Sequence, residues 1–330
     1  MSESESRSLV TGGAGFIGSH LVDALLERGD RVIVVDDLSS GRRENLEAAL
    51  AGDQLELVEE DISAAPALSA IAAEFSPGVI FHLAAQVDVR KAIEDPIRDA
   101  EVNVLGTINV LEAARSVEGC PIIFSSTGGA IYGEGLASAE ALPFAETAKV
   151  APESVYGTSK LAGEEYLALY RRLHGVPSLA MRFGNVYGPR QDPGKEAGVI
   201  AIFCGRLAEG VAPTVFGDGT QTRDYIYVAD VVAGLLAADR ALAATPELEG
   251  PYNLGTGVEA SVLELVEILS GLADDPLPAK FKPARKGEVL RSVISAAAAE
   301  SELQWRPQVS LLDGLRRSFE SVREARAGSG

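Results

Sequence analysis

The chain has 330 residues, 46% of them hydrophobic, and a formal net charge of −19 at pH 7. This size and apolar content suffice for one large domain or a domain with an attached lobe. The acidity argues against a nucleic-acid or anionic-membrane partner, so a phosphate-bearing ligand must be held by a few placed donors. Two cysteines, a polar start and the lack of any run of membrane-spanning length make a reducing cytoplasm the expected location.

The first predicted element is a strand from Ser8 to Thr11 that breaks into a glycine-rich turn, Gly12 to Gly18, and restarts as an amphipathic helix. Such a turn presents several backbone N–H groups and the positive end of a helix dipole at one point. Glycine also lets a pyrophosphate touch the backbone. These features predict a dinucleotide site. Glycine-rich turns without a ligand are also common, so the context of the neighbouring strand and the residue at its end is needed to distinguish the two.

The second predicted strand, Arg31 to Val35, supplies that context. It ends in Asp36, eighteen residues after Gly18. A carboxylate at this position can accept hydrogen bonds from both ribose hydroxyls and repels a 2′-phosphate. We therefore expect NAD rather than NADP.

Strand-like and helix-like stretches alternate through the rest of the first half. The expected strands are Leu55–Val58, Val79–Leu83 and Ile122–Ser126, and the expected helices are Leu68–Phe75 and Val102–Val117. This series predicts an α/β fold of the Rossmann type, a doubly wound parallel sheet with helices on both faces. Ligands of such sheets bind beyond the carboxyl ends of the strands.

After Arg182 the pattern loosens into loops rich in glycine and proline. Helices are expected at Val199–Glu209, Val231–Leu242, Val262–Leu272 and Leu312–Arg323. We interpret residues 1–182, with parts of 220–260, as the NAD-binding domain. Residues 183–330 are expected to form a smaller, interleaved substrate lobe.

Tyr156 and Lys160 lie four residues apart in a helical stretch that runs to His174. This spacing puts both side chains on one helical face. A phenolate near neutral pH needs about 4 kcal/mol of differential stabilisation. A neighbouring ammonium and a positive nicotinamide ring supply a contribution of that order, so Tyr156 could remove a proton from an alcohol. Taken alone, the pair could equally be a solvated helix face; the glycine turn and the Ser/Thr cluster ending at Thr127 favour catalysis.

Together these stretches resemble the extended short-chain dehydrogenase/reductases, and among them the UDP-galactose 4-epimerase group of nucleotide-sugar enzymes. The resemblance covers nearly the whole chain. It is carried by Thr11–Gly18, Asp61-Ile62, His82–Ala85, Asn103–Thr107, Ser125–Thr127, Tyr156-x-x-x-Lys160, Arg182–Arg190 and Arg223–Val228.

The resemblance implies a 4-epimerase in which Tyr156 takes the proton of the sugar 4-hydroxyl, Thr127 hydrogen-bonds that hydroxyl, and Lys160 holds the nicotinamide ribose and lowers the pKa of Tyr156. The implied NAD contacts are Gly12, Gly15, Phe16, Ile17, Gly18, Asp36, Asp37, Ser39, Ser40, Gly41, Asp61, Ile62, Leu83, Ala84, Ala85, Gln86, Asn103, Ser125, Tyr156 and Lys160. The implied UDP-sugar contacts are Thr127, Gly128, Gly129, Asn185, Arg190, Val199, Phe216, Arg223, Arg285 and Glu288.

Departures from the family patterns narrow the expected reaction. Related 4,6-dehydratases place an Asp-Glu pair after the Ser/Thr at Thr127, and related decarboxylases place a glutamate there, whereas this chain has Gly128-Gly129. The acid and base that an elimination needs are therefore missing directly after Thr127. UDP-glucose and UDP-galactose are the expected substrates. Arg190 would suit the carboxylate of UDP-glucuronate or could equally pack the lobe, and the small Ser292 would admit an N-acetyl group.

Other features carry weaker expectations. The three histidines, His20, His82 and His174, are not spaced as metal ligands, so packing or surface roles and no metal site are expected. The resemblance implies a homodimer formed through Val102–Val117 and Tyr156–His174. A non-catalytic NAD-sensing Rossmann protein is the alternative of another class, but such sensors often lose the Tyr/Lys pair that this chain keeps.

Overall fold

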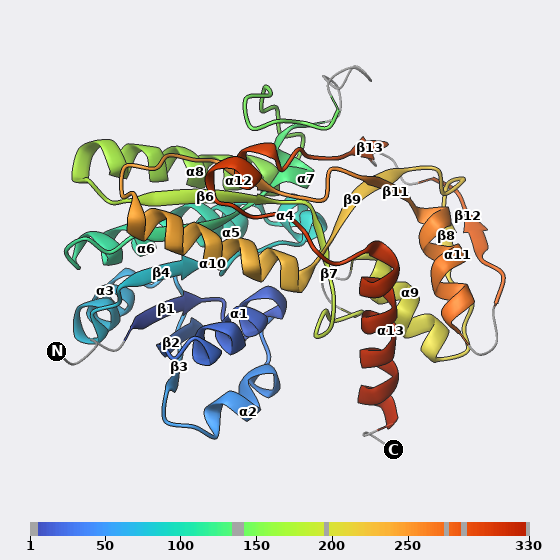
Figure 1. Ribbon diagram of the computed structural model, residues 1–330, viewed down its shortest axis with the longest axis horizontal. Helices are drawn as coiled ribbons and strands as arrows, with labels where there is room; N and C mark the ends of the chain where they lie inside the picture. The colour runs from blue at the N-terminus through green and yellow to red at the C-terminus, as the bar shows by residue number, and fades with distance from the viewer. Residues whose placement is uncertain (1–5, 134–141, 195–197, 274–276, 285–288, 328–330) are drawn as a thin grey trace.

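A computed structural model describes residues 6–133, 142–194, 198–273, 277–284 and 289–327. Its centre is a seven-stranded parallel sheet in the order β10-β6-β5-β4-β1-β2-β3 (Figure 1). The strands are β1 (Arg7–Thr11), β2 (Arg31–Asp36), β3 (Leu55–Glu59), β4 (Val79–His82), β5 (Ile122–Thr127), β6 (Ser178–Phe183) and β10 (Tyr252–Leu254). Strands β1 to β6 are arranged in the order that is typical of the Rossmann fold. The predicted fold class is therefore confirmed.

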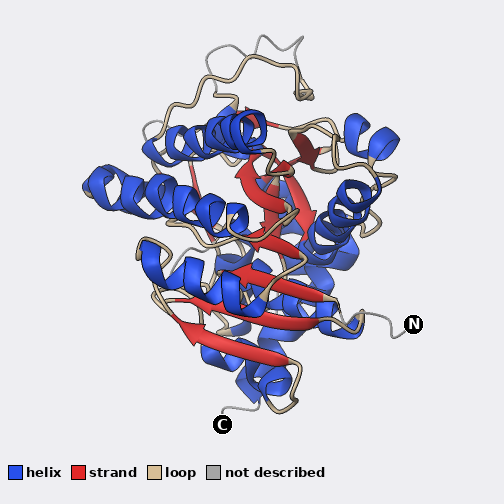
Figure 2. Ribbon diagram, turned by 90° about the vertical axis from the view of Figure 1, so that its left-hand side faces the viewer, coloured by secondary structure: helices blue, strands red, loops and turns tan. Residues whose placement is uncertain are grey.

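Helices cover both faces of this sheet, as Figure 2 shows from the side. One face packs against α1 (Phe16–Glu27) and α10 (Val228–Ala244). The other packs against α3 (Ala65–Phe75), α6 (Gly106–Arg115) and α8 (Val155–His174). Because both faces are covered, the inner strands β2 and β4 are largely runs of buried apolar residues without alternation.

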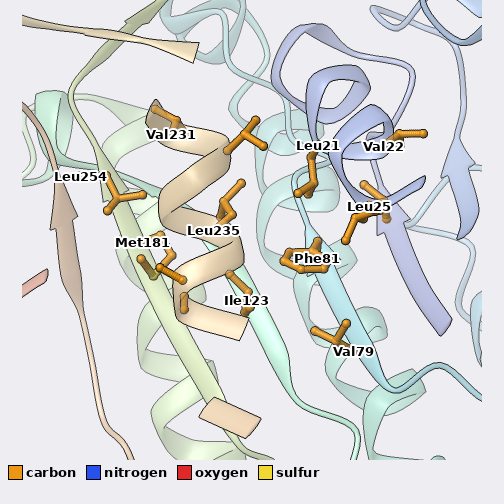
Figure 3. Packing of buried hydrophobic residues seen from close by; sticks show 14 of the residues in the cluster. Leu21, Val22, Leu25, Val79, Phe81, Ile123, Met181, Val231, Leu235 and Leu254 are labelled. Carbon is orange, nitrogen blue, oxygen red and sulfur yellow. The ribbon is translucent and has the colours of Figure 1, made fainter. Parts of the chain in front are cut away.

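The first of these faces is seen from close by in Figure 3. Leu21 and Leu25 of α1 lie over Phe81 of β4, while Leu235 of α10 lies near Ile123 of β5 (Figure 3). All five side chains are fully buried. This packing holds α1, which directly follows the glycine-rich turn, against the sheet.

The later part of the chain forms a smaller lobe, which lies beside the sheet (Figure 1). Its helices are α9 (Val199–Ala208), α11 (Val262–Leu272) and α13 (Leu311–Ala327), which share an apolar core with the lobe strands. Those strands are β7 (Asn185–Tyr187), β8 (Thr214–Phe216), β9 (Thr222–Tyr227), β11 (Glu259–Ser261), β12 (Lys280–Lys282) and β13 (Arg291–Ser292). Strand β10, in contrast, returns to the large sheet beside β6.

The segment expected to be helical over Val102–Val117 is helical from Glu101 to Arg115, but it begins as a π-helical turn, Glu101–Leu105, and becomes α-helical at Gly106. The wider turn has no local sequence signal. The part after Arg182 was expected as loops around helices, but it holds the short strands named above. Most of these are two or three residues long, too short for a periodic pattern.

The remaining helices are short and connect the larger elements. They are η1 (Arg43–Leu46), α2 (Glu47–Leu50), α4 (Val89–Glu94), α5 (Pro96–Ala100), α7 (Gly128–Ile131) and α12 (Ala297–Glu302). In the part of the chain that the structure describes, we find no helix with the length and apolar character needed to span a membrane.

Candidate active site

A cavity of about 480 Å³ lies at the carboxyl edge of the large sheet. Successive strand ends contribute to its wall: the glycine turn after β1, Asp36 at the end of β2, Asp61 after β3, Leu83 to Gln86 after β4, and Ser125 to Thr127 of β5. A parallel sheet brings these ends to one edge because all its strands run in the same direction. The cavity therefore lies where ligands of this fold bind.

The glycine turn has the tight backbone geometry that is typical of dinucleotide-binding turns. Gly12 has a φ of +70°, and a Cβ there would lie 2.6 Å from the backbone nitrogen of Ala84. A Cβ at Gly18 would lie 2.1 Å from the carbonyl oxygen of Gly12. The turn is thus tight enough to require glycine at both positions, and α1 begins directly after Gly15, so its free N–H groups are available to a pyrophosphate.

Asp36 lines the cavity at the end of β2 and is 6% exposed. Its two carboxylate oxygens accept hydrogen bonds from the N–H groups of Ala14 and Leu38, both at 2.9 Å. Burial raises the pKa of Asp36, while these two N–H groups act against the rise. A Cβ at Gly41 would lie 2.6 Å from Asp36 Oδ1, so the loop after β2 closes tightly over this carboxylate. The arrangement holds Asp36 in the position that suits a ribose.

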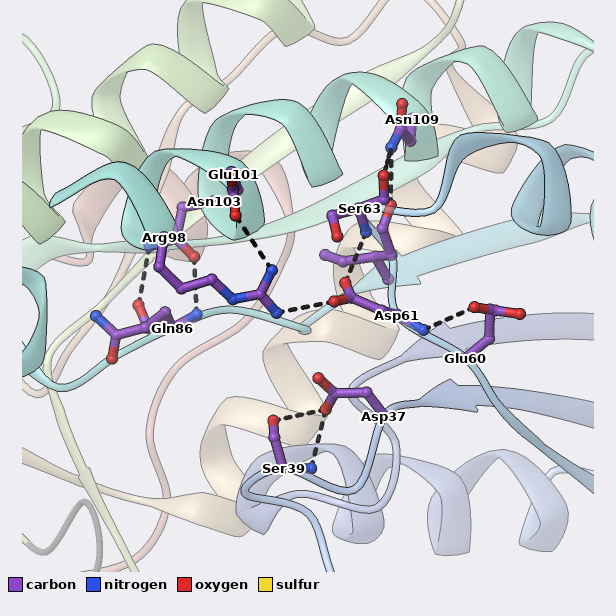
Figure 4. Close-up of polar contacts among 11 residues, drawn as sticks. Asp37, Ser39, Glu60, Asp61, Ser63, Gln86, Arg98, Glu101, Asn103 and Asn109 are labelled. Atoms are coloured by element: carbon purple, nitrogen blue, oxygen red, sulfur yellow. Dashed lines mark hydrogen bonds and ion pairs between the residues drawn. The ribbon is translucent and has the colours of Figure 1, made fainter. Parts of the chain in front are cut away.

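Asp61 is held by a residue that the sequence did not point to (Figure 4). Arg98 of α5 donates from Nη2 to Asp61 Oδ2 at 2.8 Å, and the Ser63 N–H donates to Asp61 Oδ1 at 2.8 Å. Burial acts to raise the pKa of Asp61, but Arg98 and Ser63 hold it below its ordinary value. Arg98 itself lines the cavity.

Gln86 and Asn103 form a pair at the opposite side of this polar cluster (Figure 4). The Gln86 N–H donates to Asn103 Oδ1 at 2.8 Å, and Asn103 Nδ2 donates to the Gln86 carbonyl at 2.9 Å. Gln86 lines the cavity. Asn103, which was expected to touch the cofactor, is 2% exposed and lies behind Gln86, outside the cavity wall. Asn103 thus supports the cavity wall from the π-helical turn.

Tyr156 and Lys160 line the same cavity from α8, and Thr127 lines it from the end of β5. The hydroxyl of Ser154 caps α8 by accepting from the Gly157 N–H at 3.0 Å. Tyr156 therefore lies in the first turn of a capped helix, half-buried at the cavity wall. Lys160 follows one turn later on the same face, as the spacing predicted.

Lys160 is 2% exposed. Its Nζ donates to the carbonyl oxygen of Ser125 at 2.9 Å and lies 4.7 Å from the centre of the Phe124 ring. Burial lowers the pKa of Lys160 to about 7, against the opposing effect of the Asp99 and Glu164 carboxylates. Burial therefore weakens the preference of this side chain for its charged form.

The residues expected at the sugar nucleotide are spread more widely. Thr127 and Arg190 line the cavity, and Arg190 also forms an ion pair with Asp23 of α1 at 2.8 Å. Gly129 lies beside Asn185, since a Cβ on the glycine would be 3.5 Å from Asn185 Oδ1. The cavity wall described above does not include Gly128, Gly129, Asn185, Val199, Phe216 or Arg223. Arg285 and Glu288 lie outside the described residues.

The other residues expected at NAD mostly line the cavity. These are Gly12, Gly15, Phe16, Ile17, Gly18, Asp37, Ser39, Ser40, Ile62, Leu83, Ala84, Ala85 and Ser125. Several polar wall residues were missed: Arg42, Asn45, Glu60, Lys91, Arg98, Ser126, Gln191 and Asp192. Arg42 and Asp192 form an ion pair. Arg42 directly follows the expected Gly41, and Asp192 lies two residues after the expected Arg190, so those stretches could have been extended. Arg98 had no such signal, because its partner Asp61 is 37 residues away.

The histidines lie apart from one another. His82 is fully buried between Thr11 and Thr107, and burial lowers its pKa to about 3. His20 lies 3.0 Å from the Pro189 carbonyl through its Nε2. Among the described residues no group of three or more His, Cys, Asp or Glu side chains is placed to hold a metal ion.

Comparison with known proteins agrees with this geometry. Residues 8–255 match the NAD dependent epimerase/dehydratase family. A UDP-glucose 4-epimerase of Mycolicibacterium smegmatis is 44% identical over 317 residues, 96% of this chain and 98% of that protein.

Solved structures agree as well. The Thermotoga maritima UDP-glucose 4-epimerase with UDP-glucose is 41% identical with a TM-score of 0.90, over 97% of this chain and 99% of that one. The Thermus thermophilus UDP-glucose 4-epimerase complex with NAD is 40% identical with a TM-score of 0.85, again over 97% and 99%. The chain belongs to the NAD dependent epimerase/dehydratase family.

Proposed function

We propose that the chain is an NAD-dependent UDP-sugar 4-epimerase that interconverts UDP-glucose and UDP-galactose through a transient 4-keto sugar. The observation that carries the proposal is that the glycine turn, Thr127 and the Tyr156–Lys160 pair line one cavity. The names of the relatives, UDP-glucose 4-epimerases at 40–44% identity, support the same activity.

In this proposal the chain's own residues move the proton. Tyr156, as phenolate, takes the proton of the sugar 4-hydroxyl, and the Thr127 hydroxyl hydrogen-bonds the same oxygen. The Lys160 ammonium stabilises the phenolate electrostatically. When bound, NAD supplies the hydride acceptor and, in the reverse half, the hydride donor. The keto sugar turns over in the cavity, so that hydride returns to the opposite face of carbon 4 while Tyr156 gives its proton back to the 4-oxygen.

The residues at the end of β5 support a reaction in which the sugar is oxidised and then reduced again, without a dehydration or decarboxylation. Thr127 is followed by Gly128 and Gly129, which begin α7. No carboxylate therefore stands directly after Thr127 to act as the acid or base of an elimination. This favours epimerisation over dehydration or decarboxylation at the same fold.

For the substrate nucleotide we propose contacts from the later part of the chain, residues 183–330. Asn185 and Arg223 come from β7 and β9, which are neighbours in one sheet. Val199 and Phe216 lie at the start of α9 and the end of β8. The contacts of Arg285 and Glu288 are part of the same proposal. Arginine suits a diphosphate because its guanidinium binds phosphate oxygens in pairs.

UDP-glucuronate is the second candidate substrate, because Arg190 lines the cavity and a guanidinium suits a carboxylate. UDP-N-acetylglucosamine is the third. Ser292 is a small side chain, buried on β13, at the position expected to limit the size of the sugar.

The experiment is a product assay with a panel of UDP-glucose, UDP-glucuronate and UDP-N-acetylglucosamine. We expect the 4-epimer of UDP-glucose to form without net reduction of added NAD. The Tyr156→Phe variant should keep its fold and NAD binding but lose activity by about 10² to 10⁴-fold, the usual contribution of a general base. Near-normal turnover by Tyr156→Phe would reject the assigned base. Absence of any product from the whole panel would favour an NAD-sensing protein instead.

We also propose that the enzyme is a homodimer that pairs through α6 and α8 and the elements beside them. This is supported by an apolar patch, Val89, Ile93, Ile97 and Leu105, which lies on α4, α5 and the π-helical turn next to α8. Ile97 is 71% exposed and Ile93 65% exposed. Large aliphatic side chains exposed together commonly mark a surface that another chain covers.

A further inference from the structure

The buried carboxylate of Asp99 lies beside the active site but has no part in the reaction described above. Asp99 belongs to α5 and is 1% exposed. Its Oδ1 accepts hydrogen bonds from Gln86 Nε2 and Asn103 Nδ2, both at 3.1 Å. Its Oδ2 accepts none from the residues that the structure describes. Both donors are neutral amides, so they do not balance the negative charge of Asp99.

A short chain of contacts connects Asp99 with the helix that carries Lys160. Asn103 Nδ2, which donates to Asp99, also lies 3.2 Å from the hydroxyl oxygen of Ser159, the residue before Lys160 on α8. Lys160 is buried as deeply as Asp99, and its Nζ contacts the Ser125 carbonyl and the Phe124 ring, both of which are neutral. A buried ammonium without a counter-charge is strongly disfavoured.

The other charged groups around Lys160 are already paired or carry the wrong sign. Glu164, one turn further along α8, forms a buried ion pair with Arg182 of β6 at 2.6 Å and also accepts from Ser126. His82 of β4 is neutral, and Lys91 of α4, at the cavity wall, adds positive charge. Tyr156 carries a negative charge only as the phenolate that Lys160 is needed to stabilise.

We propose that Asp99 is a positioning residue that balances the charge of Lys160 and so keeps this side chain an ammonium while Tyr156 takes a proton from the substrate. The catalytic consequence rests on the proposed function, whereas the charge pair itself is a property of the folded chain. Opposite charges that share a buried environment interact much more strongly than they would in water. The direction of the Asp99 effect on the pKa of Lys160 agrees with this geometry.

The test measures the protonation of Lys160 directly. The chain has only seven lysines, so the side-chain signals of protein labelled with ¹³C-lysine can be resolved by NMR and Lys160 identified by its loss in Lys160→Met. In Asp99→Asn, which keeps the oxygen that accepts from Gln86 and Asn103, the Lys160 midpoint should fall by about one pH unit or more. An unchanged midpoint would overturn the proposal.

The matched control is Glu101→Gln, which removes an exposed carboxylate two residues further along the chain. Its Lys160 midpoint should stay at the wild-type value, because water screens an exposed charge. If Glu101→Gln and Asp99→Asn shift the midpoint equally, a general charge effect explains the result and the pairing is wrong.

The catalytic readout is separate. In Asp99→Asn we expect kcat for the 4-epimer at pH 7 to fall about tenfold, with the acidic limb of the pH profile moved to higher pH and KM little changed. If the Lys160 midpoint shifts in Asp99→Asn but the wild-type protein epimerises none of the substrates, the proposed function is wrong and the charge pair is supported. If the Lys160 midpoint is unchanged in Asp99→Asn and the wild-type protein is active, the charge pair is wrong and the proposed function is supported.

A second variant keeps the test decisive if Asp99→Asn does not fold. A charge pair predicts that the double variant Asp99→Asn/Lys160→Met regains a cooperative unfolding transition, because both buried charges are removed together. A purely structural Asp99 predicts that the double variant is no more stable than Asp99→Asn, and that outcome would also overturn the proposal.

Discussion

His82 shows how one buried ring acquires a defined protonation state. Thr107 Oγ1 donates its proton to the Asn103 carbonyl at 2.7 Å, so it can only accept from His82 Nε2. His82 Nδ1 must then accept from the Thr11 hydroxyl, 2.7 Å away. The ring is therefore a neutral Nε2–H tautomer, in keeping with the packing role expected for it.

This state makes His82 a source of acid sensitivity. Its pKa is lowered by burial to about 3 in the folded chain, from 6.5. Between those values the unfolded chain binds one more proton, so stability falls as the pH falls, by about 1.4 kcal/mol per pH unit. We expect the free energy of unfolding of His82→Gln, measured in urea from pH 6 to pH 4, to fall less steeply than wild type by about that slope. Parallel slopes for the two proteins would contradict the neutral ring.

We predict that Asp36 sets the preference of the site for NAD over NADP. In Asp36→Asn one oxygen remains to accept from a backbone N–H, but the negative charge that repels a 2′-phosphate is gone. We expect NAD to bind about tenfold or more weakly, as when a charged hydrogen-bond acceptor is lost, and the preference for NAD over NADP to shrink. Titration with both cofactors measures this directly. A variant that discriminates as strongly as wild type would exclude the ribose contact.

At the scale of elements, the sequence predicted those helices, strands and turns whose structure depends on their own residues. The glycine turn, α1 and the apolar run of β2 were evident because each is fixed by its own residues. Arg98 and Asp99 were not, since their partners Asp61, Gln86 and Lys160 come close only once α5 packs against the sheet edge and α8. The π-helical turn that aims Asn103 at Gln86 was hidden for the same reason.

The first turn of α8 offers an element-scale test, because it carries Tyr156. Ser154→Ala removes the side chain that accepts from the Gly157 N–H, which should lower the free energy of unfolding by about 1 kcal/mol. Ser154→Asp should retain stability, since aspartate also caps and favours the positive end of the helix. Urea unfolding of the three proteins checks this. Equal stability of Ser154→Ala and wild type would mean that the cap is dispensable.

At the scale of the whole molecule, the cavity is closed by contacts between distant parts of the chain. Arg190 and Asp192, which follow β7, form ion pairs with Asp23 of α1 and with Arg42 after β2. These pairs are partly exposed, so each adds little to stability. They connect the segment after β7 with α1 and with the segment after β2, both of which contribute to the cavity wall.

The apolar patch of Val89, Ile93, Ile97 and Leu105 provides a test of the proposed dimer. If a second copy covers it, wild-type protein should have twice the 34.5 kDa mass of the chain in light scattering. The double variant Ile93→Glu/Ile97→Glu should be a monomer, because four carboxylates would be buried in the symmetric interface without partners. Val258→Glu is the control, since Val258 is 66% exposed and directly precedes β11 of the smaller lobe. It should remain a dimer, and a double variant that did so too would place the interface elsewhere.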